Sequence, residues 1–339
     1  MYEENSGGLT TALKEASAAV FTDEMIEQIL SLSTSNGDTA VALEEIEVAA
    51  GGEVTVAAGT EVAYVTAPAN GPITLGDVPV VLFQGTTGVD ATFQGTGASD
   101  NAGIVGRVVV GTAGSDNIVI RDALNSQIAI GEGDTVVTGA GWDTVVAGMG
   151  DSTVMGGEGY AIVQLGGNRS DYVVTVGDNG EAIVTGGGSS TTITGIQYVA
   201  LDGGDALILA KDEVEAAVST LYETTFGRAA DAYGLEFWFR MARNGVSLND
   251  IAESFVNSAE YADVVGDITD STFVNNLFKQ TYGHDASAED LVAYQAKLDA
   301  GSSRADLIEE FAAAAGELIA DGSGAEVVGS VTIIPGTFD

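Results

Sequence analysis

A nine-residue period in valine and glycine constrains this sequence more than any other feature. The repeated positions are Val136, Val145, Val154 and Val163, then Gly139, Gly148 and Gly157, and then Gly141, Gly150 and Gly159. Nine residues that hold one tight turn and one short strand make half a coil of a flattened β-solenoid, so about 18 residues make a full coil. We expect one apolar residue of each strand to point into a narrow core, while the glycines permit the turns.

The β-rich region is longer than this repeat. From about residue 45 to about residue 210 the chain is rich in Gly, Val and Thr and has almost no Lys or Arg, which is typical of strands and turns. Related segments lie upstream, with the sequences GTTGVD at 85–90, GTGASD at 95–100 and GTAGSD at 111–116. Residues 169–210 are typical of a β-meander, and we expect this meander to cap the open end of the solenoid.

A second internal repeat follows, with helical spacing. Residues 221–260 align with residues 277–316 without gaps. The matched pairs include Leu221 with Leu277, Phe226 with Tyr282, Gly227 with Gly283, Trp238 with Tyr294, and Phe255 with Phe311. We expect the aromatic residues to form the core of a duplicated helical unit, with glycines at helix ends. A ligand site made of these aromatic residues is the alternative.

These changes in composition and periodicity divide the chain into five segments. They are an N-terminal helical segment at 1–45, a Gly-rich solenoid at 46–168, the meander cap at 169–210, a duplicated helical domain at 211–320 and a strand-like tail at 321–339. The predicted fold class is mixed, with β and α structure segregated: a β-solenoid or β-roll-like region followed by an all-α duplicated helical domain. Within the first segment we expect helix over residues 9–33.

The charge of the chain limits its partners. Fifty Asp and Glu residues oppose 11 Lys and Arg residues, which gives a formal net charge of −39. Such a polyanion repels nucleic acid and anionic lipid, and it attracts cations. Hard divalent cations such as calcium prefer oxygen ligands, which carboxylates supply. The alternative is that the charge only keeps the protein soluble.

The absence of cysteine excludes disulfides, thiolate zinc sites and cysteine nucleophiles. The first residues lack the basic and apolar regions of a conventional signal peptide, and no apolar stretch approaches the ~18–20 residues of a transmembrane helix. We therefore expect no membrane insertion. The chain is either cytosolic or exported by a route that does not read its N-terminus.

The glycine-rich repeat resembles the RTX family of calcium-binding nonapeptide repeats, whose pattern is G-G-x-G-x-D-x-U-x. The best matches are GTAGSDNIV from Gly111 and TGAGWDTVV from Thr138. In that family calcium lies between adjacent coils, held by the Asp and by carbonyls of the Gly turns. The resemblance implies calcium as a cofactor. Its candidate ligands are Asp90, Asp100, Asp116, Asp134, Asp143 and Asp151, with Gly111, Gly114, Gly139 and Gly141.

The spacing of these aspartates predicts where they lie on the solenoid. Asp116 and Asp134 are one coil apart on one edge, and Asp143 falls on the opposite edge with Asn125 one coil before it. Asp151 is one place out of register. Several positions of the pattern hold other residues, which are Glu132, Ser152, Tyr160 and Ala161. The alternative is a metal-free solenoid whose Asp side chains close turns by hydrogen bonds.

The first copy of the helical repeat resembles a helical domain of unknown function, related to phycobilisome linkers, that is found in secreted RTX and surface-layer proteins. The segment that carries the resemblance is LYETTFGRAADAYGLEFWFRMARNGVSLNDIAESFVNSAEY. In the second copy His284 replaces Arg228, and Tyr294 replaces Trp238. The resemblance covers about a third of the chain.

The sequence does not point to an enzyme. His284 is the one histidine, it has no second histidine at metal-ligand spacing, and neither a catalytic triad nor an H-E-x-x-H motif can be built around it. Paired carboxylates among the 50 acidic residues leave a polysaccharide-active enzyme as a remaining alternative.

We expect a secreted structural protein of the cell surface that self-assembles into a surface layer or an extracellular filament. The family resemblance implies export through a type I secretion system, with calcium completing the fold outside the cell. The main expected partner is a second copy of the chain, and a cell-surface polysaccharide is a further candidate. An adhesin, a matrix protein or a virion-decoration binding module is the alternative function.

The apolar tail at 324–334 is a candidate assembly strand. It can add to the open β edge of a neighbour, or it can fold back on its own chain or serve as an export signal. The residues assigned to assembly are Val327, Val328, Val331, Ile333 and Ile334.

Overall fold

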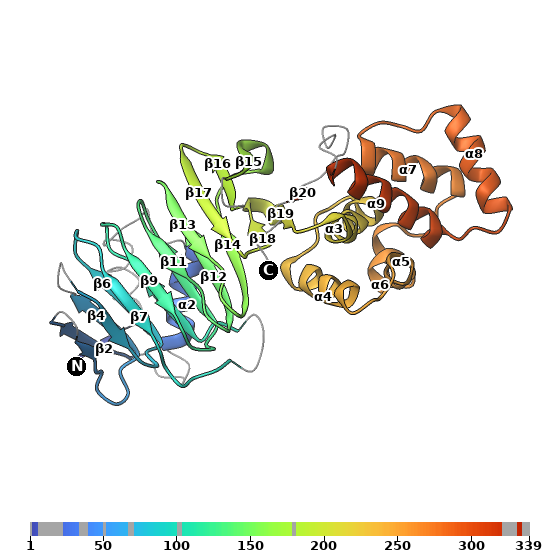
Figure 1. Cartoon of the computed structure of the whole chain (residues 1–339). Coiled ribbons are helices and arrows are strands. Elements are labelled where there is room, and N and C mark those ends of the chain that lie inside the picture. The colour runs from blue at the N-terminus through green and yellow to red at the C-terminus, as the bar shows by residue number, and fades with distance from the viewer. Residues whose placement is uncertain are drawn as a thin grey trace. The chain divides into compact units, whose positions relative to one another are not determined.

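The computed structural model describes residues 2–5, 23–33, 40–49, 52–66, 71–99, 104–177, 181–320 and 331–333. The chain forms two compact units, Met1–Val199 and Ala200–Asp339 (Figure 1). The first unit is rich in strands and the second is mostly helical. Among the residues described here, no helix is long and apolar enough to cross a membrane.

The first unit is a β-solenoid whose strands alternate along the chain between two mainly parallel sheets. We call them sheet A and sheet B. In the first unit sheet A holds β1 (Tyr2–Asn5), β2 (Ala40–Glu47), β4 (Val62–Thr66), β6 (Val80–Gln84), β8 (Arg107–Val110), β10 (Ser126–Ile130), β12 (Trp142–Ala147), β14 (Tyr160–Gln164) and β18 (Tyr198–Ala200). In spatial order, sheet B holds β15 (Tyr172–Val176), β16 (Ala182–Gly186), β17 (Ser189–Thr194), β13 (Ser152–Met155), β11 (Thr135–Val137), β9 (Asn117–Ile120), β7 (Asp90–Phe93), β5 (Ile73–Leu75) and β3 (Glu53–Val54).

The repeated valines set the register, as the sequence predicts. Val136 of β11 is paired with Val154 of β13, and Val145 of β12 is paired with Val163 of β14. All four side chains are fully buried. A period of nine residues therefore sends successive valines to opposite sheets, and both sheets direct them into one core.

The coil length is not constant, which corrects one prediction. Gln127 is paired with Thr144, 17 residues later, so Ser126 rather than Asn125 lies opposite Asp143. Between β7 and β9 the coil is longer, because Asp90 is paired with Asn117, 27 residues later. Spacing counted along the sequence misses both changes, since it assumes that every coil has the same length.

Helix α2 (Asp23–Ser33) covers the part of the outer face of sheet A that β4, β6 and β8 form. Its fully buried Met25 and Ile29 belong to one cluster with Val62, Val80 and Val108. The strands beneath it are therefore buried on both faces and do not alternate between apolar and polar residues. The helix predicted over 9–33 is confirmed for 23–33, and residues 9–22 lie outside the described residues.

Two of the predicted boundaries are wrong. Residues 2–5 form a strand that pairs antiparallel with β2, and β2 begins at Ala40, so the solenoid starts inside the segment predicted as helical. The meander is confirmed for β15, β16 and β17. However, β17 pairs in parallel with β13 and so continues sheet B, while β19 (Ala206–Ala210) belongs to the second unit.

In the second unit the strand-like tail folds onto its own chain. β20 (Val331–Ile333) pairs in parallel with β19, with Ile208 opposite Val331. This is the alternative to strand addition that the sequence left open. Val327, Val328 and Ile334 lie outside the described residues.

The helices of the second unit repeat one packing arrangement. Phe255 contacts the rings of Tyr222, Phe226 and Trp238, with centroid distances of 4.7, 5.4 and 5.4 Å. Phe311 contacts the corresponding rings of Phe278, Tyr282 and Tyr294 at 5.0, 5.8 and 5.2 Å. The predicted duplication is therefore confirmed, and the aromatic residues form its core. The helices are α3 (Glu213–Phe226), α4 (Ala232–Arg243), α5 (Leu248–Val256), α6 (Ala259–Val264), α7 (Asp270–Tyr282), α8 (Ala288–Asp299) and α9 (Arg304–Ala320).

We predict that Phe311→Ala destabilises the second unit by about 3–5 kcal/mol, because it leaves a cavity among three other rings. Phe237→Ala is the matched control, since the Phe237 side chain is 41% exposed, and it is expected to cost about 1 kcal/mol or less. Urea unfolding followed by the helical circular dichroism signal measures both. Equal losses for the two variants would contradict this account of the core.

Candidate functional site

Three buried aspartates stand at the corners of the solenoid. Asp116 precedes β9, Asp134 precedes β11, and Asp143 is the second residue of β12. Each residue is at most 2% exposed. Asp116 and Asp134 lie at the same edge on neighbouring coils, and Asp143 lies at the opposite edge. We call these three residues the aspartate ladder.

Each ladder carboxylate joins its own turn to the preceding coil. Asp134 Oδ1 accepts the backbone N–H of Asp116 at 2.7 Å, and its Oδ2 accepts that of Gly131 at 2.6 Å. Asp143 Oδ1 accepts the N–H of Ser126 at 2.8 Å, and its Oδ2 accepts that of Gly139 at 2.7 Å. In both cases one oxygen closes the local turn and the other binds the coil before it.

Asp116 repeats this pattern with one more donor. Its Oδ1 accepts the N–H of Val89 in the preceding coil and the hydroxyl of Thr112, both at 2.8 Å. Its Oδ2 accepts the N–H of Thr112 at 2.6 Å. Hydrogen bonds from backbone N–H groups to a buried carboxylate are charge-assisted, and each is stronger than a bond between neutral groups.

These carboxylates do not fit the predicted calcium site. Calcium takes six to eight oxygen ligands, whereas every ladder oxygen already faces a hydrogen-bond donor. In the described part of the chain, no group of three or more His, Cys, Asp or Glu residues is placed to hold a metal ion. The geometry favours turn closure by hydrogen bonds, and calcium binding stays a prediction without a site among these residues.

The other predicted ligands lie apart from the ladder. Asp151 is exposed and accepts the N–H of Ser190 at 2.9 Å, while Ser152 occupies the ladder position on that coil. Asp90 accepts the side-chain amide of Asn117 at 3.0 Å. Asp100 lies outside the described residues. The prediction that Asp151 is one place out of register agrees with this arrangement.

The predicted glycines serve close approach between coils. A Cβ on Gly139 would lie 2.5 Å from the carbonyl oxygen of Asp122, and one on Gly141 would lie 2.6 Å from that of Leu124. Gly114 comes equally close to the backbone of the preceding coil, and Gly111 faces the carboxylate of Asp116. None of these four has a positive φ. These four glycines therefore allow close approach between coils and do not supply a left-handed backbone conformation.

Sequence reasoning missed a buried ion pair. The fully buried Arg107 donates from Nη1 and Nη2 to the two carboxylate oxygens of Asp122, at 3.0 and 2.8 Å, and lies 4.8 Å from the ring of Phe93. Asp122 also accepts the N–H of Gly95 at 2.9 Å. The pair fixes the start of the long connection from Phe93 to Arg107. Basic residues are rare in the β region, and this rarity was the sequence feature that could have drawn attention to Arg107.

Burial changes the acidity of the ladder. Desolvation raises the pKa of Asp134 and that of Asp143 to about 6, from an ordinary value of 3.8, although backbone hydrogen bonds oppose the shift. The chain therefore holds two carboxyl groups that titrate near neutral pH inside the solenoid.

Comparison with known protein families finds a match in the helical unit. A family described as "Domain of unknown function (DUF4214)" matches residues 212–265 and 252–318, two overlapping ranges that agree with the duplication. No curated protein matches the chain, and no solved structure does. The family match does not reach the solenoid, so the resemblance of that region to calcium-binding repeats stays a prediction.

We predict that removal of calcium with EDTA leaves the β-sheet circular dichroism signal and the unfolding midpoint unchanged, because backbone N–H groups occupy the ladder oxygens. Asp134→Asn is expected to lower the stability by about 1–3 kcal/mol, since an amide accepts at only one of the two positions. That loss should be the same with and without calcium. Unfolding by EDTA that calcium, but not magnesium, reverses would contradict the metal-free ladder.

We also predict a pH dependence of stability. Between pH about 4 and 6 the folded chain keeps protons on Asp134 and Asp143 that the unfolded chain has lost. The stabilisation is complete below the ordinary pKa and disappears as the pH rises through about 6. Each pKa unit corresponds to about 1.4 kcal/mol.

Urea midpoints measured from pH 7 down to pH 5 test this dependence. The natural chain should gain stability, and Asp134→Asn/Asp143→Asn should gain less, because its ladder has lost both titrating groups. The double variant separates the ladder from the general relief of charge repulsion. Identical slopes for the two proteins would contradict the assignment.

Proposed function

We propose that this chain is a structural protein that associates with copies of itself through one edge of its solenoid, as the subunit of a surface layer or an extracellular filament. The observation that carries the proposal is the edge strand β15 at one end of sheet B. β15 pairs with β16 on one side, and no other described strand pairs with it. Its Val173 and Val176 are 63% and 51% exposed.

The backbone of β15 offers hydrogen-bonding groups at this edge. The N–H of Gly177 donates to the carbonyl of Glu181 at 2.8 Å, so Gly177 faces β16. Backbone groups alternate in direction along an antiparallel strand, so those of Val174 and Val176 face away from β16. An edge strand of this kind is a template for pairing with another chain.

The charge of the protein favours a second copy at this edge over the rest of the surface. With a net charge of −39, two copies repel each other over most of their surfaces. The five residues of β15 carry no charge, so repulsion is lowest there. Antiparallel pairing of β15 with itself is self-complementary, so this edge joins two copies by a two-fold contact, and a layer or a filament is built from such pairs through a further contact.

The solenoid supplies the rigid body that such a subunit needs. Its coils are joined by parallel strands and by the aspartate ladder, so this proposal does not depend on calcium. We place the protein outside the cell, as an exported component of the cell surface. Support for this placement comes from the acidic, cysteine-free composition, and no catalytic role is part of the proposal.

One observation favours a second candidate function, a binding module for a surface polysaccharide. Trp142 and Tyr160 are paired across β12 and β14, with ring centroids 4.5 Å apart. They alternate with the buried Asp143 and Ala161, so both rings lie on the outer face of sheet A. Neighbouring aromatic side chains on a sheet face suit the apolar face of a sugar ring.

We predict that Val173→Lys/Val176→Lys abolishes self-association, because lysines on an edge strand block pairing with another strand. Both side chains are exposed, so the variant should keep the stability of the natural chain. Sedimentation velocity across a range of protein concentrations measures the association.

Met149→Lys/Val292→Lys is the matched control, since it replaces two residues that are 80% and 72% exposed and adds the same charge. Added lysines lower the net negative charge in both variants, so charge repulsion cannot explain a loss in only one of them. A natural chain that stays monomeric, or equal association of both variants, would overturn the proposal.

A further inference from the structure

The outer face of sheet B carries no charge over a wide area. In β9, β11, β13, β17, β16 and β15, which are neighbours in this order, every second residue points away from the core (Figure 1). None of these outward residues is charged. In the three central strands they are Thr135, Val137, Thr153, Met155, Thr192 and Thr194, with Ser190 at the start of β17. We call the outward residues of these six strands the threonine face.

The strand register lines these residues up in a continuous row. Thr135 lies opposite Thr153, and Thr153 lies opposite Thr192. Ile183 and Thr175 continue the row through β16 to the edge strand β15. The row therefore presents methyl and hydroxyl groups at the strand spacing of about 4.8 Å, from the middle of sheet B to its open edge.

The neighbouring row is apolar in the parallel part of the sheet. Val119 lies opposite Val137, and Val137 lies opposite Met155. All three residues are half-buried, so part of each side chain is open to solvent. An apolar row beside a row of threonines suits packing against a second sheet, because the side chains of two facing sheets interdigitate.

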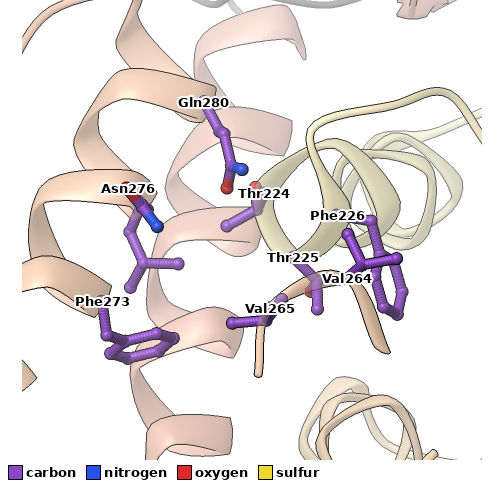
Figure 2. Close-up of a pocket in the computed structure, with 9 residues that line it drawn as sticks. Thr224, Thr225, Phe226, Val264, Val265, Phe273, Asn276 and Gln280 are labelled. Carbon is purple, nitrogen blue, oxygen red and sulfur yellow. The ribbon is translucent and has the colours of Figure 1, made fainter. Parts of the chain in front are cut away.

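The second unit offers a cavity, but a small one. It has a volume of about 90 Å³ and lies between α3, the end of α6 and α7, where the amide of Gln280 is directed toward Thr224 (Figure 2). Pockets that enclose a small-molecule ligand have volumes of roughly 300–1,000 Å³. The threonine face is the broader surface, and a broad surface suits a macromolecular partner.

Charge identifies the partner that the threonine face fits. The net charge of −39 repels nucleic acid, anionic lipid and most of the surface of another copy. A partner for this face must itself be uncharged where it makes contact, and the same face of a second copy meets that requirement. A polysaccharide is less suited, because the outward residues of these strands include no aromatic ring, in contrast to Trp142 and Tyr160 on sheet A.

The area of the face indicates that it acts between paired copies. Six strands about 4.8 Å apart, each contributing about 15 Å of length, cover on the order of 400 Å². Two single faces then bury on the order of 800 Å², which is less than the roughly 1,200–2,000 Å² of a stable interface. Antiparallel pairing along β15 joins two faces on one side of a single sheet, because its two-fold axis is perpendicular to the sheet. Two such pairs bury on the order of 1,600 Å², which is sufficient.

We propose that the threonine face binds the threonine face of a second copy, so that two edge-joined pairs pack sheet against sheet. The inference rests on the proposed pairing of β15, and it supplies a second contact that gathers two pairs into a four-copy unit. The apolar row of Val119, Val137 and Met155 packs against the other copy, with the threonine methyl groups around it.

Sedimentation velocity of the full chain, over a range of protein concentrations, tests the inference. The natural chain should pass from a two-copy to a four-copy species. Val137→Lys/Thr153→Lys should stop at two copies, with the face contact weakened about a hundredfold or more, because the contact would bury ammonium groups without partners. Thr135→Lys/Thr192→Lys is a second, independent face variant. All four side chains point outward, so both variants should fold, and their urea midpoints check this.

Met149→Lys/Val292→Lys is the matched control, since it adds the same charge outside the threonine face, and it should assemble like the natural chain. The inference alone is overturned, and the pairing of β15 stands, if the natural chain goes no further than two copies or if both face variants assemble like it. A natural chain or a face variant that is monomeric overturns the pairing of β15, and this inference with it. Retention of a two-copy natural chain, but not of the face variants, on an insoluble neutral glucan would assign the face to a polysaccharide instead.

Discussion

Stacking of one solenoid coil on the next depends on buried carboxylates that accept backbone hydrogens. Asp134 reaches the N–H of Asp116, Asp116 reaches that of Val89, and Asp143 reaches that of Ser126. Each bond satisfies an N–H at a corner, where the strand ladder ends and no carbonyl is opposite. The valine core excludes water from the coils, and the ladder fixes how one corner lies on the next.

This tight stacking accounts for the other features of the first unit. Glycine stands at positions 139 and 141 because a Cβ would meet the backbone of the preceding coil. The long connection before β8 interrupts the regular stacking of the coils. The Arg107–Asp122 ion pair holds this connection in place, and both charged side chains are buried. The stack also ends in edges, and β15 is an edge without charge in a strongly acidic protein. The rigid stack of coils and its uncharged edge strand thus come from the same architecture.

The second unit combines a repeated core with polar positions that differ between the copies. Phe255 and Phe311 occupy equivalent centres of two aromatic clusters. Arg228 lies over the rings of Tyr222 and Phe226, and His284 lies beside the equivalent pair in the second copy. The hydroxyls of Thr224 and Thr281 share a hydrogen bond, whereas Thr225 Oγ1, at the position equivalent to Thr281, has no partner in the described part of the chain. Duplication preserved the aromatic packing, and the two copies differ at these polar positions.

The period of the valines and the alignment of the two helical copies determined the solenoid, its register from Val136 to Val163 and the duplicated core, because regular spacing decides which side chains share a face. Spacing also placed Asp116 and Asp134 one coil apart, but not what their oxygens bind. Tertiary structure decided that these carboxylates face backbone N–H groups, that α2 covers part of sheet A and that Arg107 is buried. These outcomes depend on the distance between stacked coils and on contacts between residues that are far apart in the sequence. A local sequence pattern contains information on neither.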